Sequence, residues 1–151
     1  MARDLNNLAE LLQDKGDYSG AEPLFRRALA IDEKALGPDH PDVAGCLNNL
    51  AALLYAKGDY PAAEPLYRRA LAVAEKALGP DHPHVAAALN NLAELLQDKG
   101  DYSGAEPLYR RALAIDEKAL GPDHPTTQKI KSNLDDLLKK TAQTTAPKPQ
   151  N

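Results

Sequence analysis

The chain repeats itself with a period of 42 residues. The central copy is Leu47–Pro83; one near-copy, Leu5–Pro41, precedes it and another, Leu89–Pro125, follows it. The two outer copies differ at a single position, which is Phe25 in the first and Tyr109 in the third. Repetition with a period of roughly 20–50 residues is typical of stacked arrays, in which each unit buries its apolar face only against its neighbours. This feature predicts an elongated array rather than one globular core.

Each unit is predicted to contain two helices. In the first helix of the central unit, apolar residues recur at the i, i+3, i+4, i+7 spacing of a helical stripe: Leu47, Leu50, Ala51 and Leu54. Apolar residues cover more than half of its circumference, which indicates a helix buried on two sides. The second helix has an inward stripe of Ala63, Leu66, Tyr67, Ala70 and Leu71. Pro65 removes one backbone hydrogen bond within it, so we expect a slight bend or a later start there.

The signals that end and begin helices are repeated as well. Gly58 can adopt the left-handed conformation that ends a helix, and Asp59 is a suitable N-cap for the next one. Because so short a turn joins the two helices, they must fold back as an antiparallel hairpin. We expect the second helix to end at Gly79, and either Asp81 or His82 to cap the helix that follows.

The repeats also predict where each part of the chain begins and ends. Residues 1–41, 42–83 and 84–125 are expected to form repeats one to three, residues 126–140 a capping helix, and residues 141–151 a disordered tail. The capping helix keeps an apolar face for the third repeat while its other face becomes polar, as the end of a stack requires. No comparable helix covers the apolar face that begins at the N-terminus. We therefore expect a weak homodimer through the N-terminal face.

Composition narrows the classes of partner. The net charge is -4 and the pI about 5.5, which argues against nucleic acid or an anionic membrane as a partner. Cys46 is the only cysteine, so no disulfide framework forms within one chain. The first residues show no signal-peptide pattern, and no apolar run approaches the ~20 residues of a membrane span. These features predict a soluble, cytoplasmic protein.

The motifs resemble those of a known family. Gly58, Asp59 and Tyr60 at the turn, small alanines such as Ala51 where paired helices touch, and the aromatic Tyr67 resemble the tetratricopeptide repeat. The segment EKALGPDHP that closes each unit is similar to the 42-residue form found in kinesin light chains. The resemblance implies an all-α, right-handed superhelical solenoid of three helix-turn-helix hairpins and a capping helix. It also implies that the first helices line a concave groove.

The resemblance assigns a set of groove residues: Asn6, Asn7, Glu10, Gln13, Asn48, Asn49, Ala52, Tyr55, Asn90, Asn91, Glu94, Gln97 and Asn133. In related repeats such asparagines hydrogen-bond the backbone of an extended peptide. They could equally be solvated or bond between neighbouring helices. Tyr55 is the more specific signal, because both flanking units carry glutamine at that position. A groove containing Glu10 and Glu94 predicts a protein or peptide ligand of neutral or basic character.

Other functions find little support. The histidines at the corners between units, His40, His82 and His124, recur one repeat apart, too far to share a metal ion. Cys46 has apolar neighbours and is interpreted as a core residue. No phosphate-binding glycine loop or catalytic constellation is present, so we expect no enzyme activity, metal or cofactor. The sequence predicts a protein–protein interaction scaffold, with a structural spacer or self-associating array as the alternative.

Overall fold

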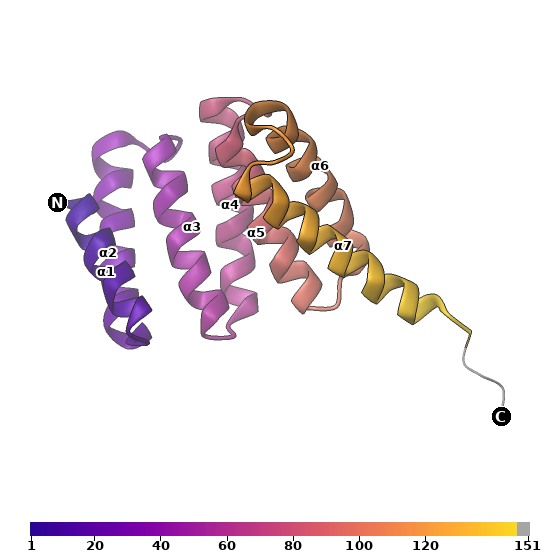
Figure 1. Cartoon of the computed structure of the whole chain (residues 1–151). Coiled ribbons are helices and arrows are strands. Elements are labelled where there is room, and N and C mark those ends of the chain that lie inside the picture. Colours follow the sequence, from indigo (N-terminus) through magenta and orange to yellow (C-terminus); the bar gives the residue numbers. More distant parts are fainter. Residues whose placement is uncertain (148–151) are drawn as a thin grey trace.

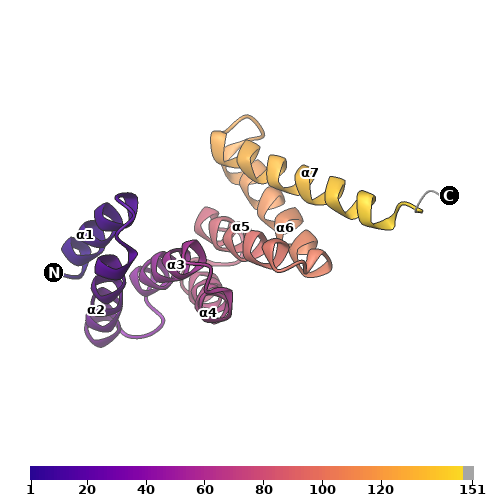
Figure 2. The same cartoon turned by 90° about the horizontal axis from the view of Figure 1, so that it is seen from below.

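A computed structural model describes residues 1–147, and this part of the chain contains seven α-helices and no strand (Figure 1). The helices are α1 (Ala2–Asp14), α2 (Tyr18–Leu36), α3 (Pro41–Ala56), α4 (Tyr60–Leu78), α5 (Pro83–Asp98), α6 (Tyr102–Leu120) and α7 (Pro125–Thr145). They form three antiparallel hairpins, α1–α2, α3–α4 and α5–α6, which stack in chain order and end with α7 (Figure 2). The expected all-α repeat solenoid is confirmed.

The short turns and corners have the expected chemistry. Gly58 has a φ of +80°, a conformation that side chains with a Cβ disfavour, and α4 begins directly after Asp59. The Asp59 carboxylate accepts a hydrogen bond from the backbone N–H of Ala62 at 3.2 Å. At the next corner the ring of His82 accepts from the backbone N–H of His84 at 3.1 Å. Of the two caps considered for this corner, the histidine is therefore the one used.

Pro65 does not delay the second helix. α4 begins at Tyr60, ahead of the proline, and its first turn already contains a hydrogen bond from the Ala63 N–H to the Asp59 carbonyl at 3.0 Å. The late-start alternative is therefore wrong. The Asp59 cap satisfies donors of the first turn, so the helix can begin there even though the N–H missing at Pro65 removes one later bond.

The core lies between the helices of each hairpin and between successive hairpins. Phe25, Tyr67 and Tyr109 are equivalent positions of the three second helices, and all are at most 3% exposed. Ala51 and Leu53 of α3 are both 0% exposed, and two positions apart they lie on nearly opposite sides of that helix. The middle first helices are thus buried on two sides, as their apolar circumference predicts.

The two ends of the stack differ. At the C-terminal end, α7 buries Leu134 and Leu137 and exposes Lys131 and Asp135, as a capping helix should. At the N-terminal end no helix covers the outer face of α1, and Leu8 is 46% exposed. One end of the solenoid is therefore capped and the other is open in the described chain.

The C-terminal boundary is a correction to the sequence analysis. α7 continues to Thr145, whereas we expected the helix to end at Lys140 and a disordered tail to follow. The hydroxyl of Thr141 donates to the carbonyl of Leu137 at 2.9 Å, and that of Thr145 donates to the carbonyl of Thr141 at 3.1 Å. Such bonds keep threonine compatible with a helix until Pro147 approaches. The expected tail residues 148–151 lie outside the described residues.

Candidate functional site

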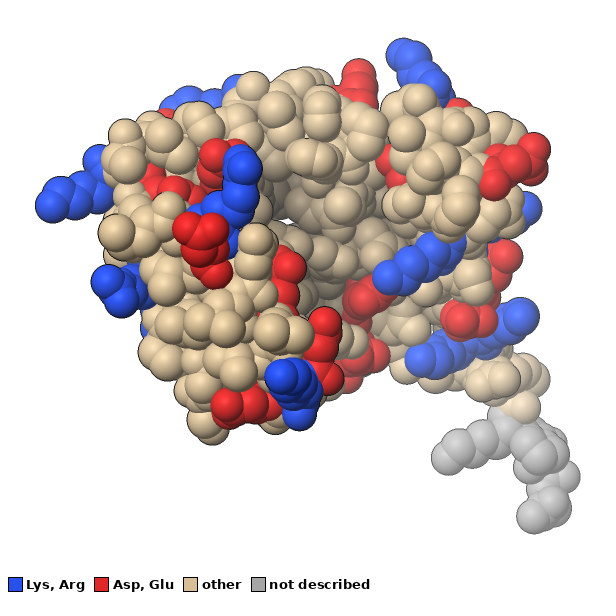
Figure 3. Space-filling model, turned by 60° about the vertical axis from the view of Figure 1, so that its left-hand side comes forward, with Lys and Arg blue, Asp and Glu red and all other residues tan. Residues whose placement is uncertain are grey.

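The inner side of the curved solenoid is lined by the first helices of successive units (Figure 2). A pocket of about 840 Å³ opens there, between α1 and the N-terminal halves of α3 and α5, and it reaches the small side chains of α4. Figure 3 shows one face of the molecule hollowed at its centre, with uncharged side chains in its depth and several acidic side chains along its lower part. A surface of this shape can hold a segment of another protein.

The pocket floor consists of very small residues. Gly45 of α3 and Ala87 of α5 line it, together with Ala70 and Ala74 of α4. A Cβ atom added at Gly45 would meet no other atom within 4 Å. The cavity therefore exists because alanine and glycine stand where larger side chains would fill the space between successive units.

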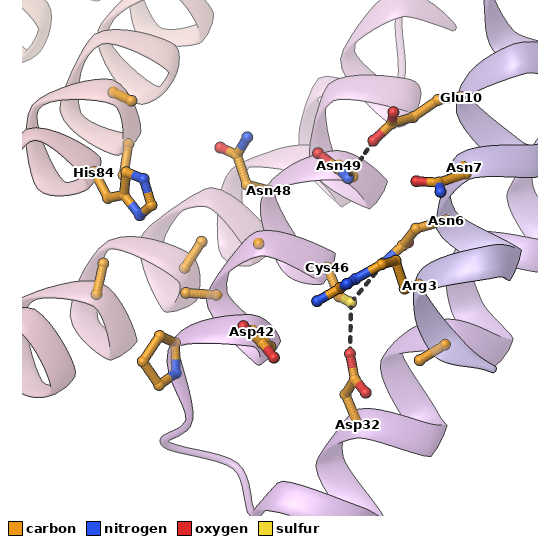
Figure 4. A pocket seen from close by; sticks show the side chains of 18 of the residues that line it. Arg3, Asn6, Asn7, Glu10, Asp32, Asp42, Cys46, Asn48, Asn49 and His84 are labelled. Atoms are coloured by element: carbon orange, nitrogen blue, oxygen red, sulfur yellow. Dashed lines mark hydrogen bonds between the residues drawn. The ribbon is translucent and has the colours of Figure 1, made fainter.

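Most of the ionisable groups around the pocket are acidic. Asp4 and Glu10 of α1, Asp32 of α2 and Asp42 of α3 line it. Arg3 reaches into it from α1, near Asp42, while His84 lies on the opposite wall (Figure 4). An excess of carboxylates at a recessed site favours cationic groups of a ligand over anionic ones.

Cys46 stands at the edge of this pocket within a small polar network (Figure 4). Its sulfur accepts a hydrogen bond from the Asn6 amide at 3.1 Å, and its thiol donates to the Asp32 carboxylate at 3.3 Å. Burial raises the pKa of the Cys46 thiol to about 11, and the Asp32 charge adds to that effect. The side chain is 2% exposed and stays a neutral thiol at physiological pH. It is a core residue, as the sequence indicates.

The structure brings only part of the predicted groove set together. Five predicted residues line the large pocket, namely Asn6, Asn7, Glu10, Asn48 and Asn49. A smaller depression of about 260 Å³ beside it is lined by Gln13 and Ala52, again with Glu10 and Asn49. The other predicted residues line neither hollow: Tyr55, Asn90, Asn91, Glu94, Gln97 and Asn133.

Most of the asparagines already bond across neighbouring first helices. The Asn91 amide donates to the Asn48 side-chain oxygen at 2.9 Å, and the Asn133 amide donates to that of Asn90 at 3.0 Å. Asn49 donates to the Glu10 carboxylate at 3.0 Å. Asn90 is only 5% exposed. The alternative of bonds between neighbouring helices is therefore observed, and these amides hold the concave side of successive units in register.

Two further polar side chains of the predicted set, Tyr55 and Gln97, also form hydrogen bonds within the chain. Tyr55 donates its hydroxyl hydrogen bond to Asp98 of α5 and stacks on Tyr60 with ring centroids 5.4 Å apart. Burial first, and then the bond to Asp98, raise the pKa of the Tyr55 hydroxyl. Gln97 accepts a hydrogen bond from the Tyr109 hydroxyl at 3.0 Å. Tyr55 therefore joins α3 to α5, so replacing it would disturb packing as well as any ligand.

The sequence analysis missed several pocket residues, which lie one turn nearer the N-terminus of the first helices than the predicted set. They include Asp42, Gly45 and His84. A signal for them exists, because these positions differ between the second and third units: Asp42 corresponds to His84, and Gly45 corresponds to Ala87. Positions that vary among close repeats are where one unit can acquire a specific role.

Two kinds of site find no support in residues 1–147. No group of three or more His, Cys, Asp or Glu side chains is placed to hold a metal ion in that range. Across the same residues, every helix is too short or too polar to traverse a lipid bilayer.

The fold and the groove define a class of protein, the helical-repeat solenoids that serve as scaffolds for protein–protein interaction. The Tetratricopeptide repeat family model matches residues 1–76, 45–118 and 84–134, so together the matches span most of the chain. The chain belongs to the tetratricopeptide repeat family. No curated protein matches it.

Solved structures agree with this assignment. A crystal structure of a Podosopora anserina putative kinesin light chain with nearly identical TPR-like repeats is 28% identical, with a TM-score of 0.85, and the match covers 93% of this chain and 67% of that one. A single-substitution form of the same protein is 27% identical over 93% of this chain and 66% of that one, also with a TM-score of 0.85. The chain thus spans about two thirds of the length of these relatives.

More distant structures share the fold. BtubC (BKLC) from P. vanneervenii is 24% identical with a TM-score of 0.83, over 99% of this chain and 67% of that one. The Yersinia enterocolitica type III secretion translocator chaperone SycD is 20% identical with a TM-score of 0.72, over 93% of this chain and 85% of that one. The expected similarity to kinesin-light-chain-type repeats is confirmed.

Proposed function

We propose that this chain is a protein–protein interaction module that holds a segment of its partner in the concave groove, with the pocket between α1, α3 and α5 as the anchoring point. The observation that carries the proposal is the pocket of about 840 Å³, which is lined by the first helices of three successive units. It is large enough for several side chains of an extended segment, and its small-residue floor would let a bulky side chain enter deeply.

The charges around the pocket support a neutral or basic partner segment. The pocket lining contains four carboxylates, those of Asp4, Glu10, Asp32 and Asp42. Arg3 is the single lysine or arginine in the same lining. A lysine or arginine of the partner would find several carboxylates, whereas an acidic residue would be repelled. The asparagines contribute less than the sequence suggests, because bonds such as Asn91–Asn48 already use their amides.

The proposed module works without catalysis, cofactor or metal, and nucleic acid and membranes are not among its partners. The cytoplasmic location expected from the sequence stays a prediction.

A structural spacer is the second candidate, and a specific observation favours it: the bonds from Asn133 to Asn90 and from Asn91 to Asn48 give the asparagine rows a role in joining repeats. The two candidates differ in whether the pocket has a ligand.

The test fills the pocket without disturbing the core. Gly45 is an exposed position within α3, and a side chain there enters open space, so Gly45→Leu should block the cavity. Leucine is a better helix former than glycine by about 0.8–1 kcal/mol, so the fold is retained. The matched control is Ala72→Leu, which adds a similar side chain at an exposed position of α4 outside both hollows.

Peptides selected by display on the full chain are titrated against both variants. We expect Gly45→Leu to weaken binding at least about tenfold, as blocking a hot-spot pocket does, and Ala72→Leu to leave it unchanged. Asp42→Asn should weaken a basic peptide and make its affinity less dependent on salt. If the selected ligands bind Gly45→Leu with the same affinity as the parent chain, the groove is not their binding site, and the structural spacer becomes the favoured function.

A further inference from the structure

The outer face of α1 carries leucines that are exposed only at this end of the solenoid. Leu8 is 46% exposed and Leu11 is 50% exposed. Their counterparts in α3, Leu50 and Leu53, are 1% and 0% exposed. In α3, α5 and α7 the corresponding face packs against the second helix of the preceding hairpin, which is α2, α4 or α6. α1 therefore presents a helix-docking face that has no partner within the described chain.

The last of these junctions is occupied by α7. Leu134 and Leu137 of α7 hold the positions that Leu8 and Leu11 hold in α1, and they are 5% and 0% exposed. α7 packs against α6, as α5 packs against α4. α7 and the outer face of α1 are thus two versions of the same docking surface.

The sequences of α1 and α6 match those of helices that already pack against a neighbouring hairpin inside the chain. Leu5–Asp14 of α1 is identical to Leu89–Asp98 of α5, which docks on α4. α6 is identical to α2 except for Tyr109 in place of Phe25, and α2 receives α3. A surface like that of α1 and a surface like that of α6 therefore each have a partner of known geometry within this structure.

We infer that α7 is a built-in stop for self-assembly: it occupies the face of α6 on which α1 of a second copy would dock, and its release makes the chain a unit of a head-to-tail assembly. The contact joins two different surfaces, so each added copy exposes a new docking face, and growth does not stop at a dimer. This inference concerns the two ends of the stack and does not depend on the groove having a ligand.

In the intact chain, α7 and the α1 helix of a second copy compete for the same face of α6, and the covalent connection of α7 to α6 favours α7. α7 follows α6 through the short corner 121–124. A short tether gives an effective concentration in the millimolar range, so a second copy at about 10 µM is at a disadvantage of about 100-fold. The docking of α7 nevertheless has two weak points, since the buried polar atoms of Asp116 and Thr127 find no hydrogen-bond partner among the described residues. Thr127 replaces a valine, Val43 or Val85, that is buried at the earlier junctions.

One residue of α1 opposes assembly. Asp4 of α1 corresponds to Cys46 of α3 in the repeat, and Asp116 corresponds to Asp32. Inside the chain, the Cys46 thiol donates a hydrogen bond to the Asp32 carboxylate. In a head-to-tail contact Asp4 would approach Asp116, and the two like charges would repel. Asp4→Ala copies Ala88 of α5 and removes this repulsion, so it should favour association.

The first experiment releases α7 in the full chain by Leu134→Asp and Leu137→Asp and measures mass by light scattering over a range of concentrations. We expect the parent to be monomeric at micromolar concentration and the released variant to exceed about three copies per particle as concentration rises. Adding Leu8→Asp and Leu11→Asp to the released variant should restore a monomer. Because the α6 face is equally exposed in both variants, this comparison distinguishes specific docking of α1 from nonspecific association through α6.

A mixing experiment gives the sharper result. The variant with all four substitutions keeps an open α6 face but has no α1 face, whereas the parent keeps its α1 face and a closed α6. Their mixture should form a 1:1 complex and nothing larger. A released variant whose mass stops at a dimer would show a symmetric contact between two α1 faces and overturn the inference, as would association that ignores Leu8 and Leu11.

A second variant covers the case in which release of α7 unfolds the chain, as judged by lost helicity in circular dichroism. Asp4→Ala in the otherwise unchanged chain should associate at millimolar concentration, where the tether loses its advantage. The same chain with Leu8→Asp added should stay monomeric. A monomer at millimolar concentration in both would show that the end faces do not dock.

Discussion

Replacing Asp116 by alanine is expected to stabilise this protein. Asp116 lies on α6 under the capping helix; it is 1% exposed, and neither carboxylate oxygen has a hydrogen-bond partner within residues 1–147. The second unit shows how an alanine fits at this position, because the residue that corresponds to Asp116 there is Ala74, which is buried at 4% exposure. The change therefore introduces a residue that this position of the fold already accepts.

The size of the effect follows from three contributions. A buried polar group without a partner costs about 1–3 kcal/mol. Alanine also gains up to about 0.7 kcal/mol of helix propensity over aspartate. The space left by the carboxyl group costs roughly 0.5–1 kcal/mol as a small cavity. The net gain is about 1–2 kcal/mol, which corresponds to a rise in Tm of about 2–8 °C for a chain of this size.

The pH dependence gives a second, independent signature. Burial raises the pKa of Asp116 above its ordinary value, and the nearby His124 opposes that shift. A carboxyl whose folded-state pKa is raised contributes stability that is complete below its unfolded pKa and is lost as pH rises through the folded one. The advantage of Asp116→Ala should therefore be greatest at neutral pH and shrink as the pH falls towards about 4.

The assay compares thermal melting with hydrogen exchange of α6 and α7, because repeat proteins can open locally at one end. Asp32→Ala is the matched control. Asp32 accepts the thiol hydrogen bond of Cys46, so its loss should be neutral or slightly destabilising. Equal or lower stability of Asp116→Ala, or the same response from both variants, would refute the view that Asp116 is an unpaired buried acid.

Three further predictions follow from single residues. Gly58→Ala should lower stability by about 1 kcal/mol in a denaturant titration, since Gly58 has a φ of +80°; an unchanged midpoint would contradict it. Glu64→Gln should cost about 0.5–1 kcal/mol at neutral pH, because hydrogen bonds from Lys99 and Arg68 lower the pKa of Glu64. That difference should vanish as the pH falls through the folded-state pKa, where the parent loses the same bonds. Ending the chain at Lys140 should leave Tm nearly unchanged, since most of the removed α7 residues are exposed; a clear drop would assign the last turns a packing role.

Local chemistry made much of the fold predictable from the sequence. Helix ends depend on residues that act on their own backbone, such as Gly58, Asp59 and His82, and each was found at its expected place. The apolar stripes depend only on the 3.6-residue period of the helix, so they predicted the two-sided burial of α3. The extent of α7 beyond Lys140 was missed because threonine hydroxyls bonding to the helix backbone are not visible in the apolar period.

The candidate site depended on contacts between units that the period cannot specify. The sequence placed Asn91 and Asn133 on the concave side, but only the packing of successive first helices shows that their amides bond to Asn48 and Asn90. The pocket likewise exists because Gly45 and Ala87, which belong to different units, line the same space together with Ala70 and Ala74 of α4. The sequence by itself determined the helices, the turns and the order of stacking, since these depend on neighbours along the chain. Tertiary structure alone decided where the solenoid is hollow, which polar groups are already paired and which end is open, because each depends on the distance between side chains about 40 residues apart.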